Sequence, residues 1–365
     1  MNTIVLEYIL KIKHLFIPVL ALLVGCHVPA DRAMDGAGGR TSYNNVLQRT
    51  SKEQMLLNIV RLRYFDVPYF LDVGNVTTQF TYKTTVAPSF TIPGFSEKNP
   101  AKIAGEVQWQ NQPTIQYAPV QGQAYVHQLL QPVGLRHIQE LLYSGWSIER
   151  VFRLIVQGFD GLLNAPEASG PLHTDAKSYD EFAEAVKLLR KFQEMGELQI
   201  GVDLAAQDED DEKKMAHQLQ LAFPAEGKDA QRLNELLYGL KMRGKRYYLT
   251  LKLGFDKTGR IGVLPRSVLS SIYFLSQGVE VPAGDKCIKE IKYCNGGDQL
   301  ITVRNCTHCP TNAFAAVKYR DRWYYIHEQD MESKKTFVLL QQLYNLKGDI
   351  STQPPPLLTL PLGLG

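Results

Sequence analysis

The sequence lacks the short motifs that mark common catalytic and nucleotide-binding sites. It contains no G-x-S-x-G elbow, no H-E-x-x-H zinc motif, no P-loop and no G-x-G-x-x-G between a predicted strand and helix. Two histidines have a carboxylate nearby, His137 with Glu140 and His327 with Glu328. Each pair lacks the second ligand or the nucleophile that metal or acyl-transfer chemistry requires. The sequence therefore identifies no catalytic residue.

A strong net charge is also missing. The chain of 365 residues has 40 Lys and Arg against 37 Asp and Glu, which gives a formal net charge of +3. A balance this close to zero does not favour nucleic acid as a partner, nor an electrostatic grip on a membrane. The acidic run 208–212 lacks the glycine and the alternating ligands of a calcium loop. A short basic cluster is explained by the end of a predicted helix: Lys241, Arg243, Lys245 and Arg246.

A membrane-spanning run of about 20 apolar residues is lacking near the N-terminus. The apolar run there, Leu15–Val24, has only ten residues and contains Pro18. Cationic residues precede it, and Gly25 and Cys26 follow, which is typical of a secretory signal. The tetrapeptide Leu-Val-Gly-Cys resembles the bacterial lipobox, which implies cleavage before Cys26 and a covalent lipid on it. An uncleaved anchor is the alternative, and the run is too short for it.

Cysteines are few, five in all. Apart from Cys26 they form one late group: Cys287, Cys294, Cys306 and Cys309. In an exported protein an even set of four favours two disulfides. Zinc is the minor alternative, because only one CxxC knuckle is present. Free or redox-active thiols are the third reading, but Pro310 and a strand-like segment follow, where a redox motif needs a helix.

Composition and length predict a folded body. The hydrophobic fraction is 44% and the charged fraction 21%, as in globular proteins. Irregular alternation of helical and strand patterns, with hairpins, predicts an α+β fold with antiparallel strands and packed helices. The expected parts are a signal peptide (1–25), a flexible tether (26–50), an N-terminal lobe (51–165), a C-terminal lobe (166–346) with a four-cysteine insert (287–309), and a Pro-rich tail (347–365).

Periodicity and capping signals predict the individual elements. Helices are expected from Ser51, over about 122–131, 134–143 and 147–161, from Ser178 to Gly196, and over about 229–242, 266–277 and 330–346. Strands are expected over about 76–82, then 107–109 and 115–117 about a turn at 111–113, and over 197–204, 217–223, 247–253, 313–319 and 323–327.

Three segments carry a resemblance to a known family. MLLNIVRLRYFDVPYFLDVGNVTTQ, RSVLSSIYFLSQGVEVP and AFAAVKYRDRWYYIHEQDMESKKTFVLLQQLYNL resemble a family of proteobacterial outer-membrane lipoproteins. The resemblance covers most of the chain after the signal and implies no catalytic residue. Lipoproteins of this general kind also sit as accessory parts of envelope machines, including the outer-membrane core of Dot/Icm type IVB secretion systems. The insert 287–309 departs from the pattern.

These observations favour a structural role. The tether, the Pro/Gly-containing segment 87–104 and the apolar, Pro-rich tail supply extended segments that suit protein contacts. We expect a lipid-anchored scaffolding component of an envelope complex at the periplasmic face of the outer membrane, with other envelope proteins as partners and no cofactor beyond the lipid. An envelope enzyme, either a hydrolase or a thiol-disulfide exchanger with a dispersed site, is the alternative.

Overall fold

The computed structural model describes residues 40–87, 104–159, 162–164, 176–201, 218–237, 240–254, 261–282, 285 and 299–348. The chain divides into two compact units, one of residues 1–51 and 77–114 and the other of 52–76 and 115–365. This division differs from the predicted boundary between residues 165 and 166. Cys26, Cys287, Cys294, the acidic run 208–212 and the tail after Gly348 lie outside the described residues.

The first described element is the helix α3 (Arg40–Arg63). It begins before the predicted start at Ser51, so residues 40–50 of the predicted tether are helical. The apolar residues that recur at helical spacing are buried as expected, among them Leu56, Ile59 and Val60 at 0% exposure. These contacts anchor the second half of α3 in the larger unit.

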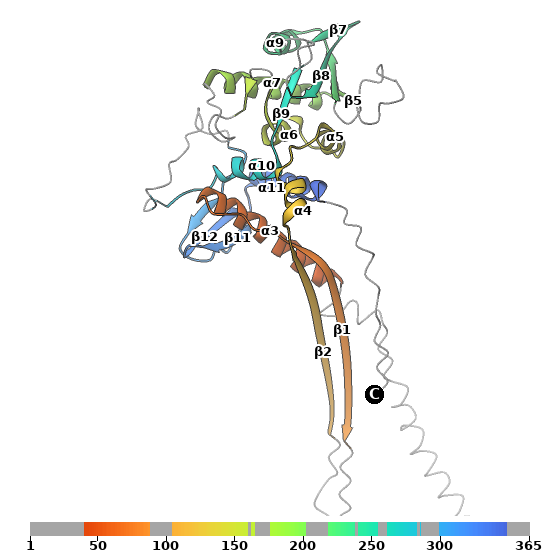
Figure 1. Cartoon of the computed structure of the whole chain (residues 1–365), viewed down its shortest axis with the longest axis vertical. Helices are drawn as coiled ribbons and strands as arrows, with labels where there is room; N and C mark the ends of the chain where they lie inside the picture. The colour runs from red at the N-terminus through yellow and green to blue at the C-terminus, as the bar shows by residue number, and fades with distance from the viewer. Residues whose placement is uncertain are drawn as a thin grey trace, which may run out of the picture. The chain divides into compact units, whose positions relative to one another are not determined.

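Two long strands follow, β1 (Leu71–Ala87) and β2 (Ala104–Pro119). They form a two-stranded sheet and lie side by side as a hairpin in Figure 1. The turn predicted at 111–113 is wrong, because β2 runs through it without a break. Pro113 lacks an N–H group, yet each strand of a two-stranded sheet has an open edge where that loss is tolerated.

Short helices connect the hairpin to the rest of the larger unit. They are α4 (Gly122–Tyr125), the π-helix η1 (Val126–Leu130), α5 (Leu135–Tyr143) and α6 (Ile148–Ile155). The predicted cap of α6 is confirmed, since the Ser147 side chain accepts a hydrogen bond from the Arg150 N–H. The helix stops six residues before the predicted end, and the chain continues directly into β3 (Val156–Phe159).

The second half of the larger unit alternates strands and helices. In chain order they are β4 (Leu162–Leu163), α7 (Ala176–Glu194), β5 (Gln199–Gly201), β6 (Gln218–Pro224), α9 (Lys228–Leu236), β7 (Lys241–Arg243), β8 (Arg246–Leu253), β9 (Ile261–Pro265) and α10 (Val268–Ser276). Seven strands form one sheet, ordered β4-β3-β9-β8-β6-β5, with β7 also on β8. All pairs are antiparallel except β8 with β9.

The end of α6 is held by Arg266, which is only 1% exposed. Its guanidinium donates to the carbonyl oxygens of Arg153, Leu154 and Val156 at 3.1–3.2 Å. The last carbonyls of a helix have no partner within the helix, and a cation there is favourable. The ring of Phe274 lies 4.2 Å from the guanidinium carbon. Arg266 thereby joins α6, β3 and α10 across the predicted lobe boundary.

The chain ends in a three-stranded sheet and a helix: β10 (Arg304–Cys306), β11 (Ala313–Tyr319), β12 (Arg322–His327) and α11 (Met331–Lys347). The strand order is β10-β12-β11. The predicted hairpin is confirmed, and its turn residues Arg320 and Asp321 have φ values of 46° and 63°. Positive φ at both central residues matches the right-handed twist of the two strands.

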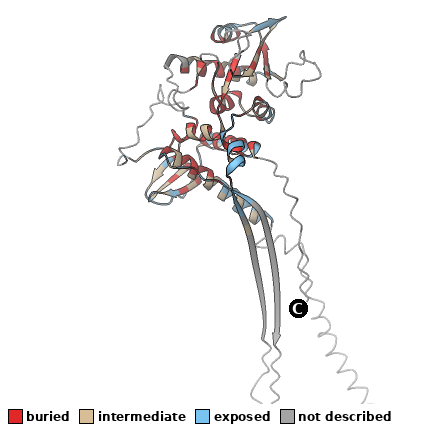
Figure 2. Cartoon of the chain, in the orientation of Figure 1, coloured by how far each residue is buried: buried red, intermediate tan, exposed pale blue. Residues whose placement is uncertain are grey.

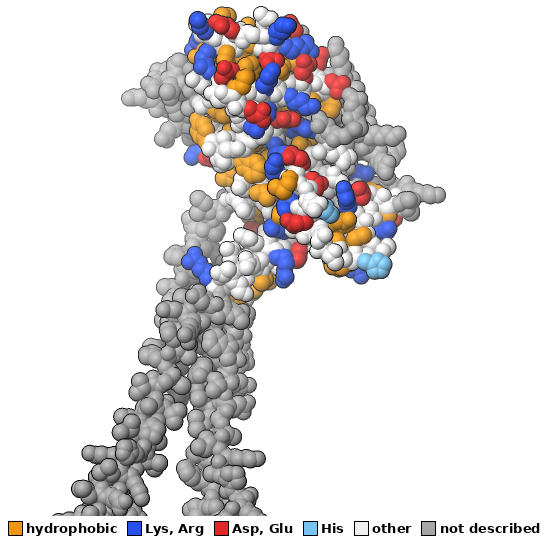
Figure 3. Space-filling model, turned by 180° about the vertical axis from the view of Figure 1, so that it is seen from behind, with side chains coloured by type: hydrophobic (Ala, Val, Ile, Leu, Met, Phe, Trp, Pro, Cys, Tyr) orange, Lys and Arg blue, Asp and Glu red, His pale blue; other side chains and the backbone are white. Residues whose placement is uncertain are grey.

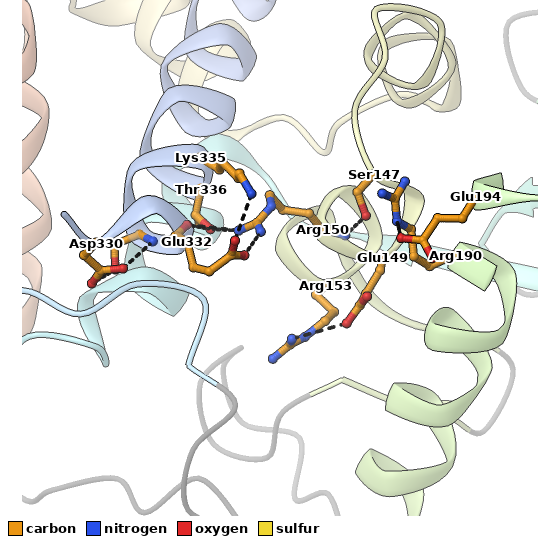
Figure 4. A network of polar contacts seen from close by, with 11 residues as sticks. Ser147, Glu149, Arg150, Arg153, Arg190, Glu194, Asp330, Glu332, Lys335 and Thr336 are labelled. Atoms are coloured by element: carbon orange, nitrogen blue, oxygen red, sulfur yellow. Dashed lines mark hydrogen bonds and ion pairs between the residues drawn. The ribbon is translucent and has the colours of Figure 1, made fainter. Parts of the chain in front are cut away.

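Polar contacts fasten α11 to α6 (Figure 4). Arg150 donates to the carbonyl oxygen of Glu332 at 3.0 Å and to Thr336 at 2.6 Å, and it pairs with the Glu332 carboxylate. Lys335 also donates to that carboxylate, at 2.9 Å. Hydrogen bonds from Lys335 and Arg150 lower the pKa of Glu332 below its ordinary value of 4.5. Asp330 caps α11 by accepting from the Ser333 N–H at 3.1 Å.

Buried apolar residues form one continuous cluster that runs from Met55 to Tyr344. Figure 2 shows them along the helices and strands of the larger unit. The cluster includes members from both predicted lobes, such as Phe152 and Phe182 at 0% exposure. Helices packed with antiparallel-rich sheets confirm the predicted α+β class. Within the described ranges, no helix has the length and hydropathy needed to cross a membrane.

Candidate interaction surface

Between α3 and β1 the chain places two kinds of side chain on opposite sides. At odd positions from 65 to 73 the side chains are apolar and exposed: Phe65 76%, Val67 80%, Tyr69 47%, Leu71 36% and Val73 39%. These five residues are named the apolar row. Scattered exposed hydrophobics are ordinary on protein surfaces, but a contiguous set on one segment marks an interaction site.

Three even positions of the same segment, 64, 68 and 70, face the protein, whereas Asp66 is half-buried and Asp72 is exposed. Tyr64 is 6% exposed and Phe70 is 2% exposed, and Pro68 is also buried. The Phe70 ring stacks on Tyr344 with centroids 5.1 Å apart, and the Tyr344 hydroxyl donates to Asp72 at 3.1 Å. Burial, and then the nearby Asp72 carboxylate, raise the pKa of Tyr344. The inner side is thus fixed to α11 while the outer side stays apolar and open.

Two side-chain amides of α3 hold the backbone of the row. Asn58 donates to the Tyr69 carbonyl at 2.8 Å and accepts from the Tyr69 N–H at 3.0 Å. Gln54, one helical turn earlier, makes the same pair of bonds with Leu71, at 3.2 and 2.8 Å. The two amides take the place of a neighbouring strand. Because the backbone is held before any partner arrives, binding to the row loses little conformational entropy.

Tyr64 belongs to a hydrogen-bonded aromatic cluster that fixes the start of the segment. Its hydroxyl lies 2.5 Å from that of Tyr324 and 3.0 Å from a carboxylate oxygen of Asp285. Burial first, and then the hydrogen bonds with Tyr324 and Asp285, raise the pKa of Tyr64. The Arg320 guanidinium lies 4.7 Å from the Tyr64 ring centroid and pairs with Asp66 at 3.1 Å. The cluster therefore ties α3 to the β11–β12 hairpin.

Phe65 occupies a strained position at the end of α3. Its φ of 59° is left-handed, and its N–H donates to the Leu62 carbonyl while that of Asp66 donates to Arg61. This is the Schellman termination, in which glycine is the usual residue at the left-handed position. A phenylalanine there costs about 1–2 kcal/mol. Burial of its ring within the described part of the chain does not offset that cost, since the residue is 76% exposed.

The hairpin β1–β2 is a second candidate surface. Its strands have 17 and 16 residues, where strands in globular proteins usually have about 5–6. Within the described residues the two strands pair only with each other in the sheet. Beyond Leu71, whose N–H and C=O bond to Gln54, the outer edges thus carry backbone N–H and C=O groups with no strand partner among the described residues.

The predicted cysteine sites are described only in part. Cys306 ends β10, and Cys309 is exposed, and neither forms a disulfide with another described residue. The Cys306 thiol donates to the His308 carbonyl at 2.9 Å, and the segment after Cys309 leads to the strand β11. A redox CxxC needs a helix at this point, so the geometry does not match the thiol-exchange reading. Disulfide pairing and the zinc alternative stay predictions, because Cys287 and Cys294 lie outside the described residues.

The isolated histidines have structural surroundings. His137 lies on α5, and burial, followed by the charge of Lys347, lowers its pKa. His327 ends β12, and its Nδ1 lies 3.2 Å from the Gln329 N–H. In the described ranges no group of three His, Cys, Asp or Glu side chains is placed to hold a metal ion.

The rest of the described surface mixes charges. On the face shown in Figure 3, basic and acidic side chains are interspersed. The basic cluster predicted at a helix end lies instead on the β7–β8 hairpin, with Lys241 and Arg243 in β7 and Arg246 in β8. Charged side chains on an exposed hairpin keep its strand edges from pairing with other chains. This is a structural reason for the basic residues here.

Sequence reasoning missed the apolar row. Its only signal is the period of two from Phe65 to Val73, and a half-buried strand with that pattern is normally expected to bury its apolar side. No family model, no curated protein and no solved structure matches this chain. The lipoprotein resemblance therefore stays a prediction.

Proposed function

We propose that this protein is a lipid-anchored, periplasm-facing scaffolding component of a bacterial envelope protein complex, such as a secretion-system outer-membrane core. The observation that carries the proposal is the β1–β2 hairpin. A two-stranded sheet is marginally stable in water at best, and additional strands or a packed cover are needed for independent stability. A neighbouring protein would therefore stabilise a hairpin with strands of 17 and 16 residues more than it would a hairpin of ordinary length.

The composition of the hairpin supports the same function. Its 33 residues contain three charged side chains, Asp72, Lys83 and Glu106. Proteins that keep a strand edge solitary use charged residues, proline or short strands to do so. Here only Pro113, the terminal Pro119 and these few charges interrupt the edges. Long, weakly charged edges suit strand addition, in which backbone hydrogen bonds supply affinity and alternate side chains supply specificity.

The predicted lipid on Cys26 supplies the location. A diacylated or triacylated cysteine holds a chain on a membrane surface, since each buried CH₂ group contributes about 0.8 kcal/mol. Held there, the hairpin meets a restricted set of neighbours at high effective concentration. A Cys26→Ser variant is expected to lose both the lipid label and membrane fractionation. Retention of the uncleaved protein in the membrane would overturn the lipoprotein assignment.

The test of scaffolding is removal of the hairpin alone. A variant in which residues 77–114 are replaced by Asn-Gly keeps all of the larger compact unit and closes the strand stumps with a favoured two-residue turn. Envelopes of both strains are extracted in mild detergent and crosslinked, and the co-purifying proteins are identified by mass spectrometry. We expect the full chain in a stoichiometric complex and the variant, still folded and lipidated, outside it.

Two results would overturn the proposal. One is a hairpin-deleted variant that stays in the complex at the parental stoichiometry. The other is a full chain that purifies as a monomer and turns over peptidoglycan, esters or disulfides. A Tyr143→Phe variant serves as a matched control, because it alters an exposed side chain on α5 and leaves the hairpin intact.

A further inference from the structure

We infer that the C-terminal tail, residues 349–365, docks along the apolar row of its own chain. The row is held rigidly by Asn58 and Gln54 and stays exposed in the described part of the molecule. The inference depends on the row and the tail alone. It does not depend on the hairpin or on the proposed scaffolding function.

The tail has the pattern that a partner of the row needs. Its leucines alternate at positions 358, 360, 362 and 364, with Thr359, Pro361 and Gly363 between them. Alternate residues of an extended chain lie on one side, so the four leucines form an apolar stripe. Prolines pre-set an extended backbone and lower the entropy lost on docking. After Asp349 the tail contains no Asp, Glu, Lys or Arg, so docking of the leucines buries no charged side chain.

The two stripes match in spacing and length. Side chains on one side of an extended segment recur about every 6.6 Å. The part of the row after the left-handed Phe65, residues 67–73, spans six residue steps, or about 20 Å when extended, and the leucine stripe would span the same six steps in an extended tail. The leucines therefore face consecutive members of the row without a change of register.

The tail also starts in the right place. Helix α11 ends at Lys347, and the Gly348 N–H donates to the Tyr344 carbonyl at 3.1 Å. Tyr344 itself stacks on Phe70, whose neighbours Tyr69 and Leu71 belong to the row. Residues 349–357 span up to about 30 Å when extended, which is enough to pass around the segment from its inner to its outer side. Docking within one chain thus needs no long-range search.

Strain at Phe65 points the same way. A left-handed phenylalanine is unfavourable at a helix end where glycine is usual, and its exposed ring recovers nothing. Covering that ring with a leucine of the tail removes apolar area from water and offsets the strain. Tail docking thereby accounts for both the exposed row and the residue that begins it.

The experiment is photocrosslinking in the purified full-length protein. The photoreactive amino acid p-benzoylphenylalanine replaces Phe65 or, in a second protein, Tyr69. Both sites are aromatic and exposed, so the substitution does not disturb the core. A third protein carries it at Tyr143, which is 63% exposed on α5 and serves as the matched control. Mass spectrometry of a mixture of ¹⁴N- and ¹⁵N-labelled chains then identifies each crosslinked peptide and separates contacts within a chain from those between chains.

We expect crosslinks from positions 65 and 69 to residues 357–364 of the same chain, and none to the tail from position 143. Replacing Leu358, Leu360, Leu362 and Leu364 by Ser is expected to lower this yield at least tenfold. Leu357→Ser, outside the stripe, is expected to change the yield less than twofold, whereas Leu360→Ser lowers the docked-to-undocked ratio about tenfold.

Three outcomes would overturn the inference. The first is a crosslink from the row to a segment other than the tail. The second is a tail crosslink found only between ¹⁴N and ¹⁵N chains, which would assign the row to a second copy. The third is equal loss of yield in Leu357→Ser and Leu360→Ser, because a stripe of alternate residues predicts a difference between them. Loss of the envelope complex in the hairpin-deleted variant bears on none of these.

Discussion

Two hairpins of the protein, β11–β12 and β1–β2, differ in what supports them within the described residues. The β11–β12 hairpin has strands of 7 and 6 residues, gains a third strand from β10, and is packed on the core through Tyr324 and Ile326. The β1–β2 hairpin has strands of 17 and 16 residues and no third strand among the described residues. The first hairpin is stabilised by a third strand and by packing on the core, whereas the second gains no further strand among the described residues.

The difference lies in what covers each sheet. Phe314 of β11 meets Phe337 of α11 edge to face, with ring centroids 5.8 Å apart, and Tyr64 of the α3 end bonds to Tyr324. Cross-strand pairs alone contribute only about 0.2–1 kcal/mol each, so burial against helices dominates the stability of a short hairpin. Burial against helices therefore matters more for the stability of a sheet than the length of its strands.

The difference between the two hairpins is tested most strongly by one substitution in each of them. Ile326→Ala in β12 is expected to lower the free energy of unfolding by about 2–5 kcal/mol, because the side chain is 0% exposed. Ile115→Ala in β2, where the residue is only partly buried, is expected to lower it by about 1 kcal/mol or less. Urea denaturation of the purified chain measures both. Equal losses would mean that the long hairpin is also held by its own chain.

A second substitution sharpens the role of the aromatic cluster. Tyr64→Phe removes the hydroxyl that bonds to Tyr324 and Asp285 and leaves a buried hydroxyl on Tyr324 with one partner fewer. The expected loss is about 1–3 kcal/mol of unfolding free energy. Tyr143→Phe is the matched control, since its hydroxyl bonds to the Ile200 carbonyl at an exposed site, and the expected change is about 0.5 kcal/mol or less. A Tyr64→Phe variant that is as stable as wild type would mean that apolar contact alone holds the end of α3 against the β11–β12 hairpin.

The smallest expected effect is a pH dependence at α11, the helix that covers the short hairpin. The folded-state pKa of Glu332 lies below its ordinary value of 4.5, so its contribution to stability is present above that value and is lost as the pH falls through the lower, folded one. Because the carboxylate is 65% exposed, we expect less than about 1 kcal/mol. Urea midpoints at pH 7 and pH 3.5 should converge between wild type and Glu332→Gln at the lower pH.

The control for this pH dependence is Glu197→Gln, which changes another exposed carboxylate. A Glu332→Gln variant that is as stable as wild type at pH 7 would show that the ion pair with Arg150 contributes nothing to the packing of α11 on α6.

Local signals predicted the elements whose sequence and surroundings agree. Ser147 caps α6, Gly196 follows the end of α7 with a φ of 73°, and the two-residue turn at Arg320 and Asp321 joins β11 to β12. Each of these depends on residues within one turn or one hairpin. The lipobox at Cys26 is of the same local kind and stays a prediction.

Long-range contacts decided what local signals missed. Residues 156–159 continue the apolar pattern of α6, yet they form β3 because β9 pairs with them antiparallel and Arg266 binds the carbonyls where the helix ends. A helical period and a short buried strand are not distinguishable by apolar content alone. The strand β9 was not predicted at all. It begins 105 residues after the first residue of β3.

By itself the sequence determined the α+β class, most of the helices and the hairpin near the C-terminus, since propensity, capping and periodicity act between residues a few positions apart. Only the tertiary structure decided which side of Phe65–Val73 faces outward. The period of two is the same for either side, and the choice was made by Asn58 and Gln54 holding the backbone and by Tyr344 stacking on Phe70. Those partners come from elements as far as 272 residues away, a separation that local patterning does not encode.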